Sequence, residues 1–208
     1  MGWSVSWLAV KNKPASEIFE HFGLKSAGEH CDCFETPISF RAQPNGWGLL
    51  ALNHCEHEFL SPQHMKALSL GGELISCTAD EHVMFSAAED WRDGARIWRV
   101  VHNCEEEIEE FKEVETFGSP PAALDEILGS LRKQQNEADE DARAHADALS
   151  RKKLGFMMVD YFFDAPIRLA ESQTGFAHDQ SLPDAAEGSS AKWDVLVSIP
   201  TKRRWLHW

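Results

Sequence analysis

Hydrophobic residues recur along the chain at two different spacings, which predict helices in some segments and strands in others. Helical spacing of three and four residues follows three sites where a capping side chain stands just before a proline. A cap oxygen satisfies a free backbone N–H, and proline in the first helical turn sacrifices no hydrogen bond. The sites are Ser61-Pro62, Ser119-Pro120 and Asp164-Ala165-Pro166. A fourth helix is predicted between Pro14 and Gly23, which stands at the expected stop.

Between these helices the hydrophobic period changes to two, which is typical of strands. The opening segment 3–9 places Trp3, Val5 and Trp7 on one face, and segment 47–53 is apolar enough for a buried strand. Further strands are predicted at 73–79, 83–88, 96–102 and 193–199. Asp93-Gly94 between 83–88 and 96–102 predicts a tight hairpin turn, because both residues tolerate positive φ.

The order of these elements predicts an α+β fold with an antiparallel or mixed sheet and helices packed on one of its faces. A long acidic helix is predicted from Pro120 toward Leu149, with an apolar stripe that weakens to alanine in its second half. We expect residues 1–180 to form a single domain. Residues 181–208 are predicted to form an extension with a linker, the strand 193–199 and a basic aromatic tail at 201–208.

Composition excludes several classes of protein. The 208 residues include 34 acidic and 20 basic ones, which gives a formal charge of −14. A chain this acidic is a poor nucleic-acid binder, because phosphate contacts require a basic face. No apolar run is long enough for a membrane span, and the first residues do not resemble a secretory signal. The 5 cysteines are an odd number, which favours reduced thiols and a cytoplasmic location.

Several segments resemble a family of uncharacterised bacterial soluble proteins with no established activity. The resemblance rests on the segments 7–11, 71–77, 81–86, 91–94, 98–102, 160–166 and 175–179. It extends over most of the chain up to Asp179. It implies a bacterial, cytoplasmic, single-domain protein and assigns no catalytic residue.

Two clusters of Cys and His suggest a metal site as an alternative. Cys31 and Cys33 lie about twenty residues before His54 and His57, and zinc binds four such ligands, usually as two close pairs. The C-x-C spacing is tighter than that of common zinc sites, and neither cluster contains a glycine-bearing turn. We therefore favour buried cysteines beside exposed histidines, and no metal or other cofactor is expected.

A second alternative is acid–base catalysis by Glu81, His82 and His102. A histidine oriented by a carboxylate titrates near neutrality and can move protons. We expect His82 and His102 to lie toward the ends of paired strands, where they could face each other. The same residues also suit a solvated turn, and no common catalytic motif occurs in the chain.

Most of the excess of acidic over basic residues lies in residues 104–147, which hold fourteen acidic and four basic residues. Within this segment, a docking surface for a basic protein partner is predicted at Glu105, Glu106, Glu107, Glu109, Glu110 and Phe111. Complementary fields of this kind steer and accelerate association. The basic tail with Lys202, Arg203, Arg204 and Trp205 is predicted to contact this acidic region of its own chain or of a second copy in a homo-oligomer.

These observations favour a cytoplasmic protein-binding or regulatory protein, with immunity proteins as one class that would fit. The alternative is a small hydrolase or metal-dependent enzyme that uses the His and Cys clusters. The two hypotheses differ in where the chemistry-bearing residues lie in the fold, because an enzyme needs them to converge and a binding protein does not.

Overall fold

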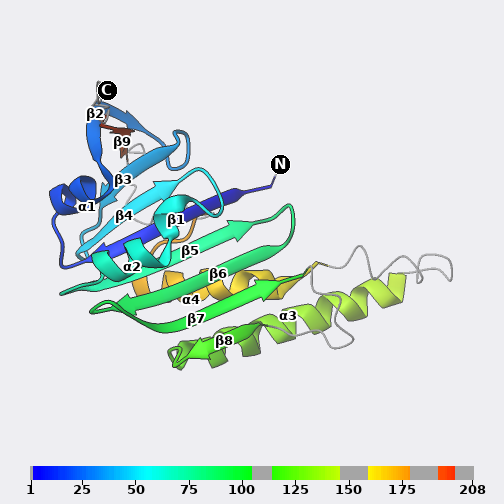
Figure 1. Ribbon diagram of the computed structural model, residues 1–208. Helices are drawn as coiled ribbons and strands as arrows, with labels where there is room; N and C mark the ends of the chain where they lie inside the picture. Colours follow the sequence, from blue (N-terminus) through cyan, green and yellow to red (C-terminus); the bar gives the residue numbers. More distant parts are fainter. Residues whose placement is uncertain (1, 105–113, 146–158, 179–191, 200–208) are drawn as a thin grey trace, which may run out of the picture.

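The computed structural model describes residues 2–104, 114–145, 159–178 and 192–199. Its centre is a nine-stranded sheet in the order β2-β9-β3-β4-β1-β5-β6-β7-β8 (Figure 1), and every neighbouring pair is antiparallel. The strands are β1 (Ser4–Lys11), β2 (Leu24–Cys31), β3 (Ile38–Ala42), β4 (Trp47–Leu52), β5 (Glu73–Asp80), β6 (Phe85–Arg92), β7 (Ala95–Asn103), β8 (Glu115–Gly118) and β9 (Trp193–Ser198).

The α-helices are α1 (Ala15–Phe22), α2 (Pro62–Leu68), α3 (Ala123–His145) and α4 (Asp164–Thr174), with short 3₁₀ turns η1 (Glu58–Leu60) and η4 (Tyr161–Phe163). The expected α+β fold with an antiparallel sheet and one long helix is confirmed. The four helix starts read from capping and proline patterns all correspond to helices, although α3 begins a few residues after its predicted cap.

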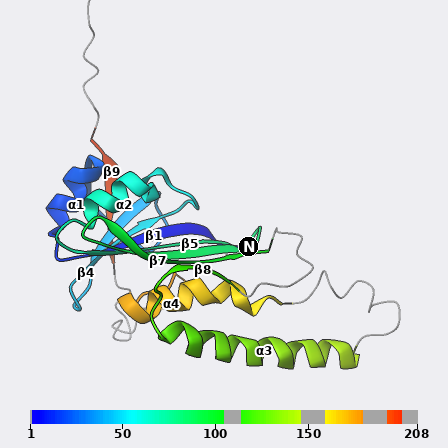
Figure 2. The ribbon, with the colours of Figure 1, turned by 60° about the horizontal axis from the view of Figure 1, so that its bottom comes forward.

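The helices lie on both faces of the sheet, whereas the sequence pattern suggested a single helical face. Figure 2 shows α1 and α2 on one side and α3 and α4 on the other. The alternation of β1 explains this arrangement, because both of its faces are apolar. Leu8 and Val10 pack in the cluster that contains α1 and α2, while Val5, Trp7 and Ala9 pack in the cluster that contains α4.

The predicted final strand, β9, is an interior strand of the sheet. It pairs with β2 on one side and with β3 on the other, and Trp193 is 1% exposed in the core. Residues 181–191, predicted as a linker, are outside the described ranges. The predicted Asp93-Gly94 turn joins β6 to β7 with φ of 47° and 78°. Strands β2, β3 and β8 have no counterpart among the sequence predictions.

The helical layer of α1 and α2 covers only part of its face of the sheet. Its apolar cluster extends over β4, β1 and β5 and reaches β6 at Trp91. Beyond that point the strands β6, β7 and β8 are open on this side, as Figure 1 shows. Glu89 and Arg99 are partly exposed there, and Phe117 is 47% exposed. The candidate site lies at the border between covered and open sheet.

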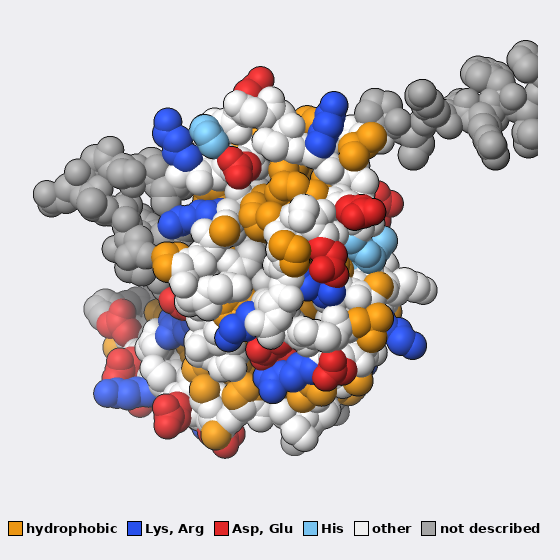
Figure 3. All heavy atoms as spheres, turned by 90° about the vertical axis from the view of Figure 1, so that its left-hand side faces the viewer, with side chains coloured by type: hydrophobic (Ala, Val, Ile, Leu, Met, Phe, Trp, Pro, Cys, Tyr) orange, Lys and Arg blue, Asp and Glu red, His pale blue; other side chains and the backbone are white. Residues whose placement is uncertain are grey.

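On the side of the molecule seen in Figure 3, acidic, basic and hydrophobic side chains are interspersed. This side therefore offers no field of a single sign, and the overall negative charge does not by itself locate a site. In the described ranges, no helix is both long and apolar enough to cross a membrane.

Candidate functional site

A groove lies where the η1–α2 segment ends above the open strands. It consists of two adjoining hollows of about 330 Å³ and 520 Å³, which share Glu56 and Phe85. The first hollow is lined mainly by residues of the segment from Glu56 to Ser61 and by β5, β6 and β7. The second lies at the ends of β1, β5 and β7 and includes Asp80, Val83 and Asn103. The two hollows therefore follow β5 and β6 as one continuous depression.

The wall of the groove is positioned by a sharp turn after β4. Glu56 has a positive φ of 55°, and His57 then caps η1 because its Nδ1 accepts a hydrogen bond from the N–H of Phe59 at 3.2 Å. Ser61 and Pro62 follow at once and start α2. Proline at this position sacrifices no helical hydrogen bond. The local sequence thus fixes where the wall begins and how it meets the sheet.

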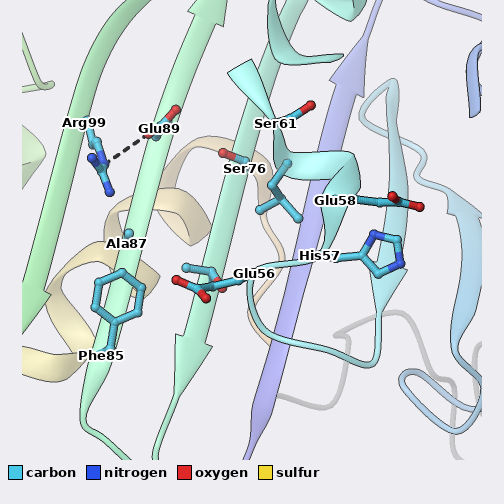
Figure 4. Close-up of a pocket in the computed structure, with 11 residues that line it drawn as sticks. Glu56, His57, Glu58, Ser61, Ser76, Phe85, Ala87, Glu89 and Arg99 are labelled. Atoms are coloured by element: carbon cyan, nitrogen blue, oxygen red, sulfur yellow. Dashed lines mark ion pairs between the residues drawn. The ribbon is translucent and has the colours of Figure 1, made fainter. Parts of the chain in front are cut away.

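The floor of the first hollow combines hydroxyl groups with apolar side chains. Ser76 and Thr78 alternate on β5, and Phe85 and Ala87 alternate on β6 beside them. Figure 4 shows Glu56 pointing across the groove toward Phe85, whereas His57 and Glu58 point away from that strand. A carboxylate therefore points toward an aromatic side chain across an open hollow.

The electrostatics of the groove are acidic because its one lining arginine is already paired. Glu89 lies 3.1 Å from Nε of Arg99 and 3.3 Å from Arg96, and it accepts a hydrogen bond from Trp91 Nε1 at 2.8 Å. The negative charge of Glu89 is thus engaged by cations of the protein itself. Glu56, in contrast, has no basic partner within the described part of the chain.

Asp80 adds a further negative charge at the second hollow. Burial opposes its ionisation, but hydrogen bonds from the Ser4 hydroxyl and from the backbone and ring of His82 outweigh burial and lower the pKa of Asp80. Its Oδ2 accepts from Ser4 Oγ at 2.9 Å, and its Oδ1 lies 3.1 Å from His82 Nδ1. Asp80 is therefore ionised at neutral pH, and its position relative to the strands is fixed.

The histidines proposed for catalysis lie apart. His82 is in the turn after β5, where its side chain is 61% exposed, and Glu81 accepts a hydrogen bond from the N–H of Trp3 at 3.0 Å. His102 is only 2% exposed and contacts Asp160. It pairs in register with Ser86, the neighbour of Phe85, and so faces the α3–α4 layer, opposite to the groove. The expected meeting of His82 and His102 does not occur.

The four metal-ligand candidates do not form a cluster. Cys31 ends β2 with its sulfur 3.5 Å from Thr36 Oγ1, and Cys33 packs against the core, where burial raises the pKa of its thiol. His54 and His57 belong to the loop after β4, and His57 is occupied as a cap. Among the described residues, no group of three or more His, Cys, Asp or Glu side chains could hold a metal ion.

The remaining sequence candidates fall outside the described ranges. These are the predicted docking residues from Glu105 to Phe111 and the basic tail at 201–208. Within the described ranges, the groove also carries carboxylates, and these come from other segments.

Comparison with known proteins finds no match. No family model, no curated protein and no solved structure is significantly similar to this chain. The resemblance to a bacterial family therefore stays a prediction, and the function must be argued from the groove itself.

Sequence patterns alone did not identify the groove, although one signal for it was present. Ser76 and Thr78 place hydroxyls at alternate positions of an otherwise apolar strand, which indicates that one face of β5 is not fully covered. Glu56, Phe85 and Arg99 carry no such signal, since each resembles an ordinary loop or strand residue.

Proposed function

We propose that this protein binds a partner protein by accepting a basic, partly apolar segment of that partner in the groove. The main support is the carboxylate of Glu56, which has no basic partner among the described residues and points toward Phe85. A lysine or arginine side chain suits this pair, because its aliphatic stem packs on an apolar surface while its charged end meets the carboxylate.

The shape and charge of the groove support a segment longer than one side chain. Asp80 extends the acidic lining beyond Glu56, while Leu60 and Val83 supply apolar contacts. Exposed carboxylates at the rim of an interface mainly steer association and determine which partner is accepted. The formal charge of −14 also favours a basic partner, because it attracts positive charge as the two proteins approach. We therefore place this protein with binding or regulatory proteins.

The enzymatic alternative gains no support from the site residues. His102 is on the face opposite to the groove, while His82 is exposed in a turn, and the Cys and His clusters supply no metal-binding group within the described residues. The hydroxyl-bearing residues of the groove are Ser4, Ser61, Ser76 and Thr78, and none of them is hydrogen-bonded to a histidine in the described structure. General-base activation of a hydroxyl requires such a contact.

The proposal is tested with a fluorescein-labelled decapeptide of alternating lysine and alanine, titrated into the full chain and followed by fluorescence anisotropy. A Glu56→Gln variant should bind it about threefold more weakly, as expected for the loss of one exposed ion pair. Glu58→Gln should weaken binding less than Glu56→Gln does, because the Glu58 side chain points away from β6. Glu29→Gln is the matched control, because Glu29 is exposed on β2, far from the groove in the sheet order, and its removal changes the net charge equally.

A groove-specific loss with an unaffected Glu29→Gln control supports the proposal, as does weaker binding at higher salt. A decapeptide of alternating glutamate and alanine should not bind. The proposal fails if the basic peptide does not bind the unmodified protein, or if Glu29→Gln weakens binding as much as Glu56→Gln does.

A further inference from the structure

Two histidines join α1 to α2 directly beside the groove. Nε2 of His21 lies 2.8 Å from Nδ1 of His64, and the ring centroids are 5.0 Å apart at 83°. One residue further along α1, Phe22 stacks on Phe59 of η1 with a centroid distance of 4.1 Å. The ring of Phe59 in turn packs edge-on against that of His64, with a centroid distance of 6.2 Å. We refer to His21, Phe22, Phe59 and His64 as the imidazole clasp.

The clasp holds the segment that forms the wall of the groove. Leu60 and Ser61 lie between Phe59 and α2, and both line the first hollow. Helix α2 has only 7 residues, of which Met65 and Leu68 are buried in the core. A helix this short has little stability of its own, so its position depends on tertiary contacts. Loss of the contact between His21 and His64 would therefore remove one of the contacts that hold the wall of the groove in position.

The contact between the two rings depends on how many protons they carry. A hydrogen bond between imidazole nitrogens requires one nitrogen to be an unprotonated acceptor. Two neutral rings satisfy this condition, and so does a pair with one extra proton. When both rings are protonated, both nitrogens carry hydrogen, and two positive charges face each other at a hydrogen-bond distance. The second proton therefore converts an attraction into a repulsion.

The surroundings favour the uncharged form of His21. Burial lowers the pKa of His21, with further lowering by His64 and Lys13 and partial opposition by Glu17. Glu17 is itself engaged in an ion pair with Lys13. From the η1 side the nearest titratable groups are His57 and Glu58, and burial also lowers the pKa of His57, against the raising effect of Glu58. Since the folded protein favours neutral His21, its contribution to stability is lost as pH falls below the ordinary value of 6.5.

We propose that double protonation of His21 and His64 releases the η1–α2 segment, and that partner binding in the groove is therefore lost at acidic pH. This inference rests on the proposed function for its consequence, although the release of the segment can be measured without any ligand. Histidine pairs suit such a switch, because their charge changes in the range just below neutrality.

The test compares peptide binding at about pH 7.5 and about pH 5, where histidines change charge. His64→Gln retains a side chain that can hydrogen-bond to His21 but cannot form the doubly charged pair. His54→Gln is the matched control, because it removes another histidine of the groove, one that does not belong to the clasp. The variants keep every carboxylate of the groove, so titration of those groups cancels in the comparison. We expect the affinity of the unmodified protein and of His54→Gln to fall about fivefold more than that of His64→Gln.

Amide hydrogen exchange of residues 58–68, corrected for its intrinsic pH dependence, provides the readout without ligand. Faster exchange at the lower pH in the unmodified protein, but not in His64→Gln, supports release of the segment. If the unmodified protein and His64→Gln lose affinity equally and amide exchange is unchanged, release of the η1–α2 segment by double protonation is refuted. The proposed function is not affected by that outcome. Absence of peptide binding already at the higher pH refutes the proposed function. The exchange data then still test whether the η1–α2 segment is released at the lower pH.

Discussion

His102 and Asp160 form a nearly buried pair between β7 and the segment that leads into η4. Nε2 of His102 lies 2.8 Å from Oδ2 of Asp160, and the two side chains are 2% and 9% exposed. The other oxygen of Asp160 accepts a hydrogen bond from the N–H of Phe162 at 3.0 Å. Asp160 therefore both caps η4 and connects it to the sheet, which gives His102 a structural role.

Asp160→Ala should lower the free energy of unfolding by about 3 kcal/mol, because it removes the cap and leaves the buried imidazole without this carboxylate partner. Asp160→Asn should cost only about 1 kcal/mol, since an amide oxygen can still cap η4. Urea unfolding followed by tryptophan fluorescence measures both values. Equal stability of Asp160→Ala and the unmodified protein would show that the pair contributes nothing.

Gly118 ends β8 in a conformation that excludes a side chain. Its φ is 75°, and a Cβ placed there would lie 2.1 Å from the carbonyl oxygen of Ile97. Gly118→Ala should therefore destabilise the protein by at least about 2 kcal/mol. Gly129→Ala is the control within α3, where a Cβ meets no atom within 4 Å. It should raise stability by about 0.5–1 kcal/mol, because alanine is the better helix former.

Asp90 is fully buried and forms an ion pair with Arg92 at 3.0 Å. Arg92 also pairs with Glu73 at 2.7 Å. Burial raises the pKa of Asp90, against the opposing effects of Arg92 and Trp98. The folded state thus prefers the protonated acid, so this group favours folding at low pH and disfavours it as pH rises through the raised pKa.

Asp90→Asn should consequently stabilise the protein at neutral pH, by about 1 kcal/mol or less, because Arg92 is half exposed and keeps Glu73 as its partner. The gain should shrink as the pH is lowered toward 4. Thermal unfolding of both proteins across this pH range provides the measurement. A destabilisation of the same size at every pH would contradict the argument.

The elements that the sequence predicts well are those specified by local chemistry. The helix from Ala15 to Phe22 is defined by its apolar stripe and by Gly23, and the β6–β7 hairpin by Asp93-Gly94. Strand β2 is different, because its residues from Lys25 to His30 are exposed and show no alternation. It becomes a strand through pairing with β9, which lies far away in the sequence, and only the folded chain reveals that pairing.

The same distinction explains why the groove was not predicted. Glu56, Phe85 and Arg99 lie on separate segments, and they line one groove only because η1 and α2 leave part of β6 and β7 uncovered. His102 is the converse case, because the sequence made it a site candidate and the structure places it on the face opposite to the groove. The register of β7 against β6 decides which face it occupies. A shift of one residue would have turned it toward the groove, and strand register follows from the whole sheet rather than from the local pattern.

The cysteines should differ widely in reactivity. Cys77 is 1% exposed and burial raises its thiol pKa, while burial also raises the pKa of Cys55, against a hydrogen bond from Thr78. Cys104 is exposed. Because the thiolate is the reactive form, Cys104 should react with a disulfide reagent at neutral pH while Cys77 remains unmodified. Peptide mapping of the labelled protein measures this difference, and labelling in denaturant should reach all 5 cysteines. Rapid labelling of Cys77 in the folded protein would contradict the buried position.

Arg99 provides a prediction opposite in sign to that for Glu56. Its guanidinium lines the groove and engages Glu89 at 3.1 Å, so it opposes the approach of a basic segment and reduces the charge available to it. Arg99→Gln should therefore bind the lysine–alanine peptide about threefold more tightly than the unmodified protein does, because Glu89 then retains only Arg96 as a cationic partner. Arg168→Gln is the matched control, since Arg168 lies on α4, on the opposite face, in an ion pair with Asp164 at 2.9 Å. Both variants raise the net negative charge equally, so a long-range effect would strengthen binding in both. Tighter binding confined to Arg99→Gln locates the peptide at the groove, whereas equal gains would show that only the overall charge attracts it.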